Sequence, residues 1–140
     1  MGALNLANRS TGNPCRVELT GGQVMQFLLA ALQPENLVEP RHALRGRSTG
    51  LPHVAGMRVI VHGKPPTRIE LWMGKHLVLP EERLLVVTSD LEISDILNYL
   101  YIPDEKVNYE LPTILPEVLE DYIRARSPIK IVEGTRIEFQ

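Results

Sequence analysis

The stretch from Val17 to Gln33 constrains the fold most, because it combines a strand end, a helix cap and the clearest helical pattern in the chain. The Thr20 hydroxyl can accept a hydrogen bond from an amide of the first helical turn that would otherwise be unpaired. Five apolar residues then recur at helical spacing, namely Val24, Phe27, Leu28, Ala31 and Leu32. We therefore expect a helix over residues 21 to 33 with one face in a core, followed by an irregular segment that begins at Pro34.

Length and charge limit the classes of protein and partner. A chain of 140 residues is typical of one compact domain. Its net charge of -2 gives no field that attracts nucleic acid or an anionic membrane, so neither is expected as a partner. Cys15 is the only cysteine, which excludes an intrachain disulfide and a multi-cysteine zinc site.

Targeting signals are not visible in the chain. No apolar run reaches the roughly 20 residues that a spanning helix needs, and residues 1–14 lack the pattern of a signal peptide. We expect a cytoplasmic location, with a secreted or periplasmic one open for a longer protein. The segment before Cys15 reads as an entry loop, so the chain is compatible with a fragment.

Alternating and continuous apolar runs predict the strands. They span residues 15–19, 59–61, 69–73, 77–79, 84–88, 129–132 and 136–139. The second and third form a β-hairpin around the turn at residues 63–66. The run over 84–88 is apolar throughout and predicts a strand buried on both faces. Together these strands predict a largely antiparallel sheet.

Two more helices are predicted after residue 88. Asp90 can cap the first, which Pro103 ends, and Thr113 can cap the second, with Pro116 in its first turn. The apolar positions of the first are Leu91, Ile93, Ile96, Leu97 and Leu100, and the second has a buried stripe of Val118, Leu119, Tyr122 and Ile123. Strands and helices are interspersed, so we expect an α+β fold, a single domain with mainly antiparallel sheets and packed helices.

The residue pattern contains no catalytic constellation. The four histidines are scattered without a paired carboxylate at ligand spacing, so no metal site is expected, and Cys15 on a strand is expected to be a buried, inert thiol. Phe27, Tyr122 and Phe139 occupy core-type positions.

Two groups of residues have both a structural and a functional interpretation. A basic segment carries Arg41, Arg45 and Arg47, and it is either a solvated connection or an anion-binding edge. Tyr99, Tyr101 and Tyr109 either cover the edge of the core or form a stacking surface for a planar ligand.

An ordered set of short motifs runs through the chain. It comprises Gly12-Asn13, Glu18-Leu19-Thr20-Gly21 with Gln23-Val24, Val54 to Val59, Gly74-Lys75, Leu85 to Asp90, Val118 to Ile123, and Arg136-Ile137. With these motifs the chain resembles the C-terminal domain of the 5'-nucleotidase and UDP-sugar hydrolase family over residues 1–140. The resemblance implies that domain's layered α/β/β/α fold.

The family resemblance also implies a division of labour. In that family a separate N-terminal metallophosphoesterase domain catalyses hydrolysis with two divalent metal ions, and the C-terminal domain holds the nucleotide between two aromatic rings, with arginines beside it. The resemblance therefore implies a substrate-recognition domain without catalytic residues or a cofactor of its own, joined to an upstream catalytic domain.

Departures from the family pattern put the usual pocket in doubt. The first stacking ring is missing before Asn13, and the glycine-rich loop that carries the second is replaced by the helix from Asp90. Asn13 is the one pocket residue that the match carries over. Tyr99, Tyr101, Arg45 and Arg47 are candidate replacements for binding a nucleotide or nucleoside.

Three hypotheses follow for the function. The first is a non-catalytic recognition domain of a 5'-nucleotidase-like metallophosphoesterase that acts in nucleotide hydrolysis. The second is a stand-alone binding or dimerisation module that kept this fold and lost the nucleotide pocket, with a homodimer as one partner considered. The third is a small independent hydrolase that uses the segment from Arg41 to Arg47.

Overall fold

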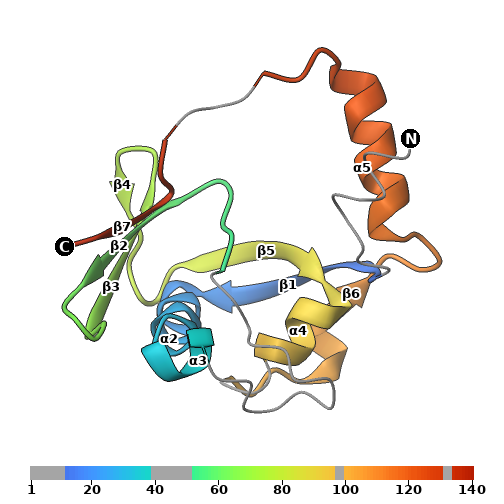
Figure 1. The fold of residues 1–140 in the computed structure, drawn as a ribbon. Helices are drawn as coiled ribbons and strands as arrows, with labels where there is room; N and C mark the ends of the chain where they lie inside the picture. Colours follow the sequence, from blue (N-terminus) through green and yellow to red (C-terminus); the bar gives the residue numbers. More distant parts are fainter. Residues whose placement is uncertain (1–11, 39–51, 97–99, 131–133) are drawn as a thin grey trace. The chain divides into compact units, whose positions relative to one another are not determined.

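The computed structural model describes residues 12–38, 52–96, 100–130 and 134–140. In chain order its elements are β1 (Pro14–Thr20), α2 (Gly21–Ala31), α3 (Pro34–Val38), β2 (Arg58–His62), β3 (Arg68–Met73), β4 (His76–Leu77), β5 (Arg83–Ser89), α4 (Asp90–Ile96), the 3-10 helix η1 (Asp104–Lys106), β6 (Val107–Tyr109), α5 (Leu115–Arg126) and β7 (Ile137–Phe139) (Figure 1). Helices and strands are interspersed along the chain, which confirms the α+β class.

The chain divides into two compact units. Unit 1 comprises Met1–Glu18, Leu85–Leu97 and Ile102–Glu133, and unit 2 comprises Leu19–Leu84, Asn98–Tyr101 and Gly134–Gln140. The described strands form a three-stranded sheet in the order β5-β1-β6 and a four-stranded sheet in the order β4-β3-β2-β7.

Helix α2 begins as the sequence predicts. The Thr20 hydroxyl accepts a hydrogen bond from the Gln23 amide at 3.2 Å, and the Gln23 side chain accepts one from the Thr20 amide at 2.8 Å. This reciprocal capping box satisfies two amides that the helix itself cannot pair, and a cap of this kind stabilises a helix by about 1 kcal/mol. The helix ends at Ala31, and Pro34 opens α3 instead of an irregular segment, since a proline fits a first helical turn.

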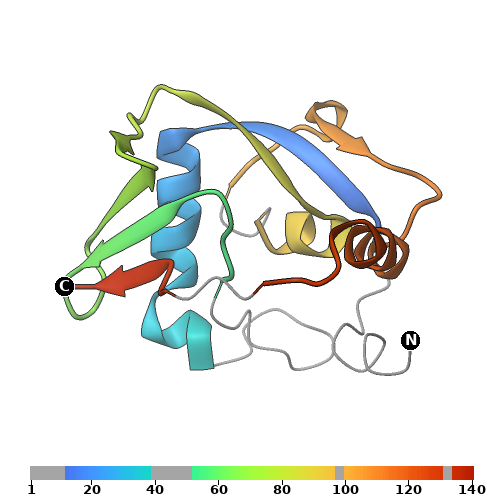
Figure 2. The ribbon, with the colours of Figure 1, turned by 90° about the horizontal axis from the view of Figure 1, so that it is seen from above.

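The core of unit 2 lies between α2 and the β2–β3 hairpin, and Figure 2 shows α2 alongside these strands. Val59 pairs with Leu71 and Val61 with Ile69, and all four side chains are buried. Each such aliphatic side chain stabilises the fold by about 1.5 to 3 kcal/mol on burial. The pairs β2–β3 and β3–β4 are antiparallel, as predicted, and β7 adds one parallel pair at the edge beside β2.

The predicted burial of two elements is wrong. Leu85 and Val87 on β5 are 63% and 72% exposed, although the run was expected to be buried on both faces. Along residues 83–88 of β5, exposed positions alternate with partly buried ones, so one face of this strand is open to solvent. Helix α5 was expected to carry a buried stripe, but none of its residues is buried and Tyr122 is 56% exposed. The apolar stripe is present, but its residues are exposed or only partly buried.

Smaller differences concern short elements. Phe139 is half exposed near the end of the chain, although it was expected in the core. Strand β6 was not predicted, because three residues are too few for a periodic pattern. Of the strand predicted over 129–132, residues 129 and 130 are not in a strand, and the rest lies outside the described residues. In the part of the chain that the structure describes, no helix has the length and hydrophobicity of a membrane span.

Candidate functional site

Asn13, the pocket residue taken from the resemblance, is held on three sides within unit 1. Its backbone amide donates to Asp90 Oδ1 at 3.0 Å, and its carbonyl accepts from the Asp90 amide at 3.0 Å. Its side-chain Nδ2 donates to the Thr113 carbonyl at 2.7 Å. These bonds join the start of β1 to the start of α4 and to the turn before α5. Within the described part of the chain, the carboxamide oxygen and one N–H are the groups that Asn13 could offer to a ligand.

Asp90 organises this cluster but does not cap its helix in the predicted way. The helix α4 begins at Asp90, and the hydroxyl of the preceding Ser89 accepts from the Glu92 amide at 3.3 Å, so Ser89 takes the capping position. Asp90 Oδ1 accepts from its neighbour Leu91 at 2.8 Å as well as from Asn13. A carboxylate in the first turn of a helix is stabilised by the helix dipole. Ser and Asp are both good caps, so the sequence did not distinguish them.

The second predicted cap is also wrong. Helix α5 begins at Leu115. The side chain of Glu117, and not that of Thr113, binds a backbone amide at the N-terminus of the helix, because it accepts from the Ile114 amide at 3.4 Å. The Thr113 carbonyl instead binds Asn13. In this way the turn before α5 becomes part of the Asn13 cluster.

Gly12 makes the close approach in this cluster possible. A Cβ atom at this position would lie 2.7 Å from Asp90 Oδ1, and the Gly12 carbonyl accepts from the Leu115 amide at 3.0 Å. A side chain here would force Asp90 away from Asn13. The Gly12-Asn13 pair of the sequence therefore has a local steric reason.

Cys15 and Tyr109 lie opposite each other on β1 and β6 beside this cluster. Burial, and then the charge of Asp90, raises the pKa of Cys15 to about 11. The pKa of Tyr109 is raised by desolvation first, and then by Asp104, Cys15 and Asp90. A thiol with so high a pKa is a poor nucleophile. The prediction that Cys15 is buried is confirmed.

The other predicted site residues belong to unit 2 or lie outside the described residues. Tyr101 is 86% exposed, so its ring is free to stack on a ligand, and it belongs to unit 2, whereas Asn13 belongs to unit 1. Arg45, Arg47 and Tyr99 lie outside the described residues, as does the whole segment from Arg41 to Arg47.

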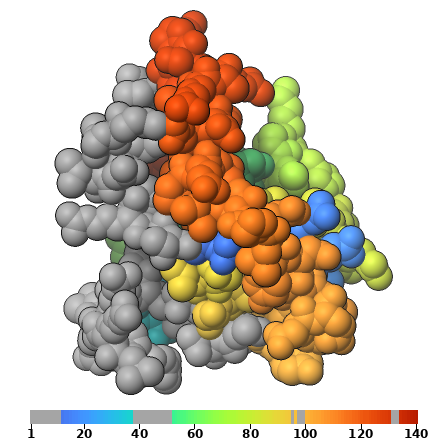
Figure 3. Space-filling model, turned by 90° about the vertical axis from the view of Figure 1, so that its right-hand side faces the viewer, coloured from blue at the N-terminus to red at the C-terminus, as the bar shows by residue number. Residues whose placement is uncertain are grey.

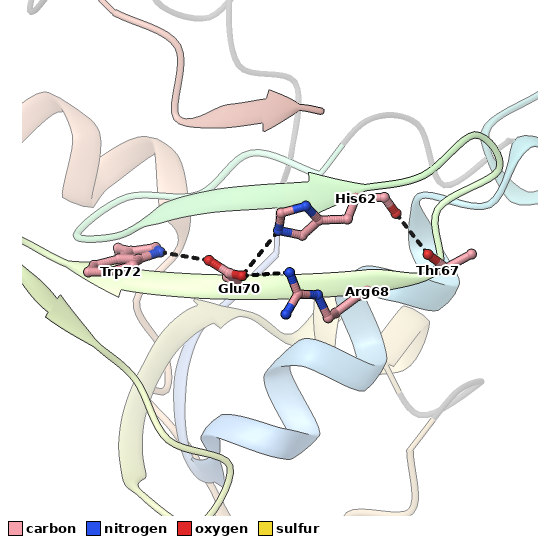
Figure 4. Close-up of polar contacts among 5 residues, drawn as sticks. All are labelled: His62, Thr67, Arg68, Glu70 and Trp72. Carbon is pink, nitrogen blue, oxygen red and sulfur yellow. Dashed lines mark hydrogen bonds and ion pairs between the residues drawn. The ribbon is translucent and has the colours of Figure 1, made fainter.

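A polar network on the β2–β3 hairpin of unit 2 was missed. Glu70 accepts from His62 Nε2 at 3.2 Å, from Arg68 at 2.9 Å and from Trp72 Nε1 at 3.3 Å (Figure 4). The side chains of His62 and Glu70 are about a quarter exposed. Cross-strand register explains the grouping, because it places His62 opposite Arg68 and Ile60 opposite Glu70.

The network braces one face of the hairpin. Arg58 lies over the Trp72 ring at 5.9 Å from its centroid and pairs with Glu138 on β7 at 3.7 Å. The signal in the sequence was the alternation of Arg68, Glu70 and Trp72, which places the three on one face of a strand. Because one carboxylate accepts from three donors, its geometry is fixed by the sheet surface.

A second histidine–glutamate pair closes the turn before β5. His76 Nε2 lies 2.9 Å from Glu82 Oε1, and Glu82 Oε2 accepts from the Leu79 amide at 3.1 Å. The hydrogen bond from His76 is the main cause that lowers the pKa of Glu82. The Glu82 carbonyl accepts from Gly21 at 2.8 Å, at the start of α2. Among the described residues, no group of three or more potential metal ligands is found.

Known proteins resemble this chain in structure rather than in sequence. No protein-family model and no curated protein sequence matches it. The structure of a 5'-nucleotidase precursor from Thermus thermophilus matches 99% of this chain with a TM-score of 0.69 and 15% identity. A protein assigned as a 5'-nucleotidase from Staphylococcus aureus, solved in complex with alpha-ketoglutarate, matches 97% with a TM-score of 0.64 and 11% identity.

The chain has the fold of one part of these 5'-nucleotidases. It spans 27% and 29% of the length of the two matched chains. The α+β fold expected from the resemblance is thereby confirmed, because the match covers nearly all of the chain. At identities of 15% and 11% the likeness extends to the fold and not to individual site residues.

Proposed function

We propose that this chain is a non-catalytic, substrate-recognition domain of a 5'-nucleotidase-like metallophosphoesterase that acts in nucleotide hydrolysis. The observation that carries the proposal is the match of nearly the whole chain to about a quarter of two 5'-nucleotidase structures. In the proposal an upstream domain provides catalysis with two divalent metal ions, and this chain provides contacts to the nucleotide.

Asn13 and Tyr101 have the chemistry that this role needs. Two backbone hydrogen bonds to Asp90 hold the Asn13 main chain, and the bond from Nδ2 to the Thr113 carbonyl orients the carboxamide. The carboxamide oxygen and second N–H could therefore bind the edge of a base or a ribose hydroxyl without much loss of entropy. The exposed ring of Tyr101 could stack on a base, and such stacking contributes about 1 to 3 kcal/mol. Arg45, Arg47 and Tyr99 stay candidates for the phosphate and the second ring.

Ligand-induced stabilisation tests the proposal. The wild type and Tyr101→Ala are heated with AMP, adenosine, UDP-glucose or inorganic phosphate, and binding is measured by calorimetry. Tyr122→Ala is the matched control, because it removes another exposed tyrosine ring. We expect AMP to raise the melting temperature of the wild type and the control in proportion to the logarithm of its concentration, and Tyr101→Ala to lose most of this shift.

The negative result is equally clear. If none of the four ligands stabilises the chain, even when it is joined to a metallophosphoesterase domain, recognition does not reside here. The stand-alone binding or dimerisation module then becomes the better description. The exposure of Leu85 and Val87 favours that second function, since large aliphatic side chains in mid-strand are usually covered.

A further inference from the structure

Strand β5 is an edge of its sheet without the usual protection. Its neighbour is β1, and no described strand pairs with its other side. Proteins commonly block such an edge with proline, lysine, a bulge or a very short strand. The seven residues Arg-Leu-Leu-Val-Val-Thr-Ser contain neither proline nor lysine, and their one charged side chain, that of Arg83, lies at the first position and outside the central run Leu85–Val87. This edge is therefore long and apolar enough to accept another strand.

Hydrogen bonds at both ends of β5 show which residues point their backbone groups outward. The Asp90 amide donates to Asn13, just before β1, and the Glu82 carbonyl accepts from Gly21, just after β1. Amide and carbonyl groups of successive strand residues point alternately to the two sides. The even-numbered residues therefore bond towards β1. Leu85 and Val87 direct their amides and carbonyls to the open side.

The same two residues also present apolar side chains to solvent. Leu85 is 63% exposed and Val87 72% exposed, and residues two apart lie on one face of a strand. Backbone donors and acceptors and an apolar surface thus coincide over Leu85–Val87. This combination is what an added strand binds, through main-chain hydrogen bonds and side-chain contacts.

We propose that β5 pairs antiparallel with β5 of a second copy of this chain, about a two-fold axis at Val86. In this register Leu85 lies opposite Val87 of the partner subunit, and the same pair recurs on the other side of the axis. Each of these pairs exchanges two backbone hydrogen bonds, and the four aliphatic side chains form one cluster. The interface is self-complementary, as a two-fold dimer requires.

The exposed apolar residues on α5 of unit 1 are a weaker candidate. Helix α5 and the segment that leads to it form a continuous surface in the space-filling view (Figure 3). Val118 and Tyr122 of this helix are exposed. A helix pairs its own backbone groups, so this stripe offers apolar contact alone. Strand β5 offers contact and hydrogen bonds together. We therefore assign the dimer to β5 and use α5 as the control.

Sedimentation velocity tests the assignment with matched variants. The wild type should form a reversible dimer over the micromolar range. Val87→Lys should weaken the dimer about tenfold or more in dissociation constant, because it places a charge in the cluster. Tyr122→Lys should leave the dimer unchanged. Circular dichroism shows whether each variant is folded, and both changes are at exposed positions.

Oxidative cross-linking tests the register. With the axis at Val86, the two Val86 Cα atoms face each other at about 4.5 Å, within the range that a disulfide spans. Val86→Cys should therefore cross-link readily, whereas Val118→Cys on α5 should not. The native Cys15 is buried and should not compete.

Three results would overturn the proposal. They are a wild type that stays monomeric at all concentrations, a dimer lost in Tyr122→Lys but kept in Val87→Lys, and cross-linking at Val118→Cys in place of Val86→Cys. None of these measurements involves a nucleotide. The dimer and the proposed recognition function can therefore fail separately.

Discussion

Asn13 joins three segments of unit 1 that are distant in sequence. Its side chain reaches the Thr113 carbonyl, 100 residues away, and its backbone exchanges two hydrogen bonds with Asp90. A partly buried hydrogen bond from a side-chain amide contributes about 1 kcal/mol to the stability of the fold. If the donor is removed, the carbonyl that loses its partner adds a desolvation cost. This residue is therefore structural as well as a candidate for ligand contact.

Replacing Asn13 should destabilise the fold measurably. We expect Asn13→Ala to lower the free energy of unfolding by about 1 to 2 kcal/mol, because the Thr113 carbonyl loses its donor. Urea denaturation followed by circular dichroism measures the change. Asn108→Ala on β6 is the control, since Asn108 is exposed, and it should differ from the wild type by less than about 0.5 kcal/mol. Equal effects of both substitutions would contradict the role of Asn13.

The role of a single residue could be predicted where one local sequence rule determines it. Thr20 was predicted as a cap because its hydroxyl, placed just before a helical pattern, can accept a hydrogen bond from an amide of the first turn. Ser89 and Asp90 stand side by side and both satisfy that rule, so the cap was placed one residue late. The Glu70 network depends on cross-strand register, which local patterns do not contain. Asn13 was found through resemblance and not through its chemistry.

The turn between β4 and β5 depends on one carboxylate. Glu82 is hydrogen-bonded by His76 and by the Leu79 amide, and the former is the main reason that its pKa is lowered. The neighbouring Gly21 leaves no room for a Cβ, because that atom would overlap the Leu79 carbonyl. The turn, the start of α2 and the pair His76–Glu82 are thus fixed together within unit 2.

Acid should weaken this turn through Glu82. A folded-state pKa below that of the unfolded chain means that the stabilisation is complete above the ordinary glutamate pKa, about 4.3, and is lost as the pH falls through the lowered value. Melting temperatures from about pH 7 to pH 3 measure this. We expect Glu82→Gln to melt lower than the wild type at neutral pH and to show a shallower acid decline. The adjacent Glu81→Gln is the control, and an acid decline equal in all three proteins would refute the role of Glu82.

Elements were predictable from periodicity, but their burial was not. The hairpin of β2 and β3 and the helix α2 have patterns that local propensity and packing both favour. Helix α5 formed where its pattern predicted, yet its stripe is not buried, because burial depends on which neighbour covers the helix. The burial of β5 could not be predicted either, because its apolar run is compatible with a buried central strand and with an exposed edge strand.

At the scale of the whole molecule, the fold and the function are supported unequally. The fold is shared over nearly all of this chain with part of two 5'-nucleotidase structures, and most of each of those chains lies outside the match. Order of motifs was sufficient to find the fold from sequence. The binding site could not be found in the same way, because the aromatic residues that the resemblance implies are missing from the corresponding segments of this sequence.

The proposed division between recognition and catalysis predicts that the isolated chain hydrolyses no phosphate ester. Phosphate release from AMP, measured with and without added divalent metal ions, should equal the buffer blank, because the chemistry is assigned to a separate two-metal domain. The control variant is Glu70→Gln, because Glu70 lies at the centre of a polar network with a histidine, an arginine and a tryptophan. Phosphate release by a contaminating phosphatase would be the same in the wild type and in this variant. Metal-dependent release that fell in proportion in this variant, while the variant stayed folded, would place catalysis in this chain and refute the division.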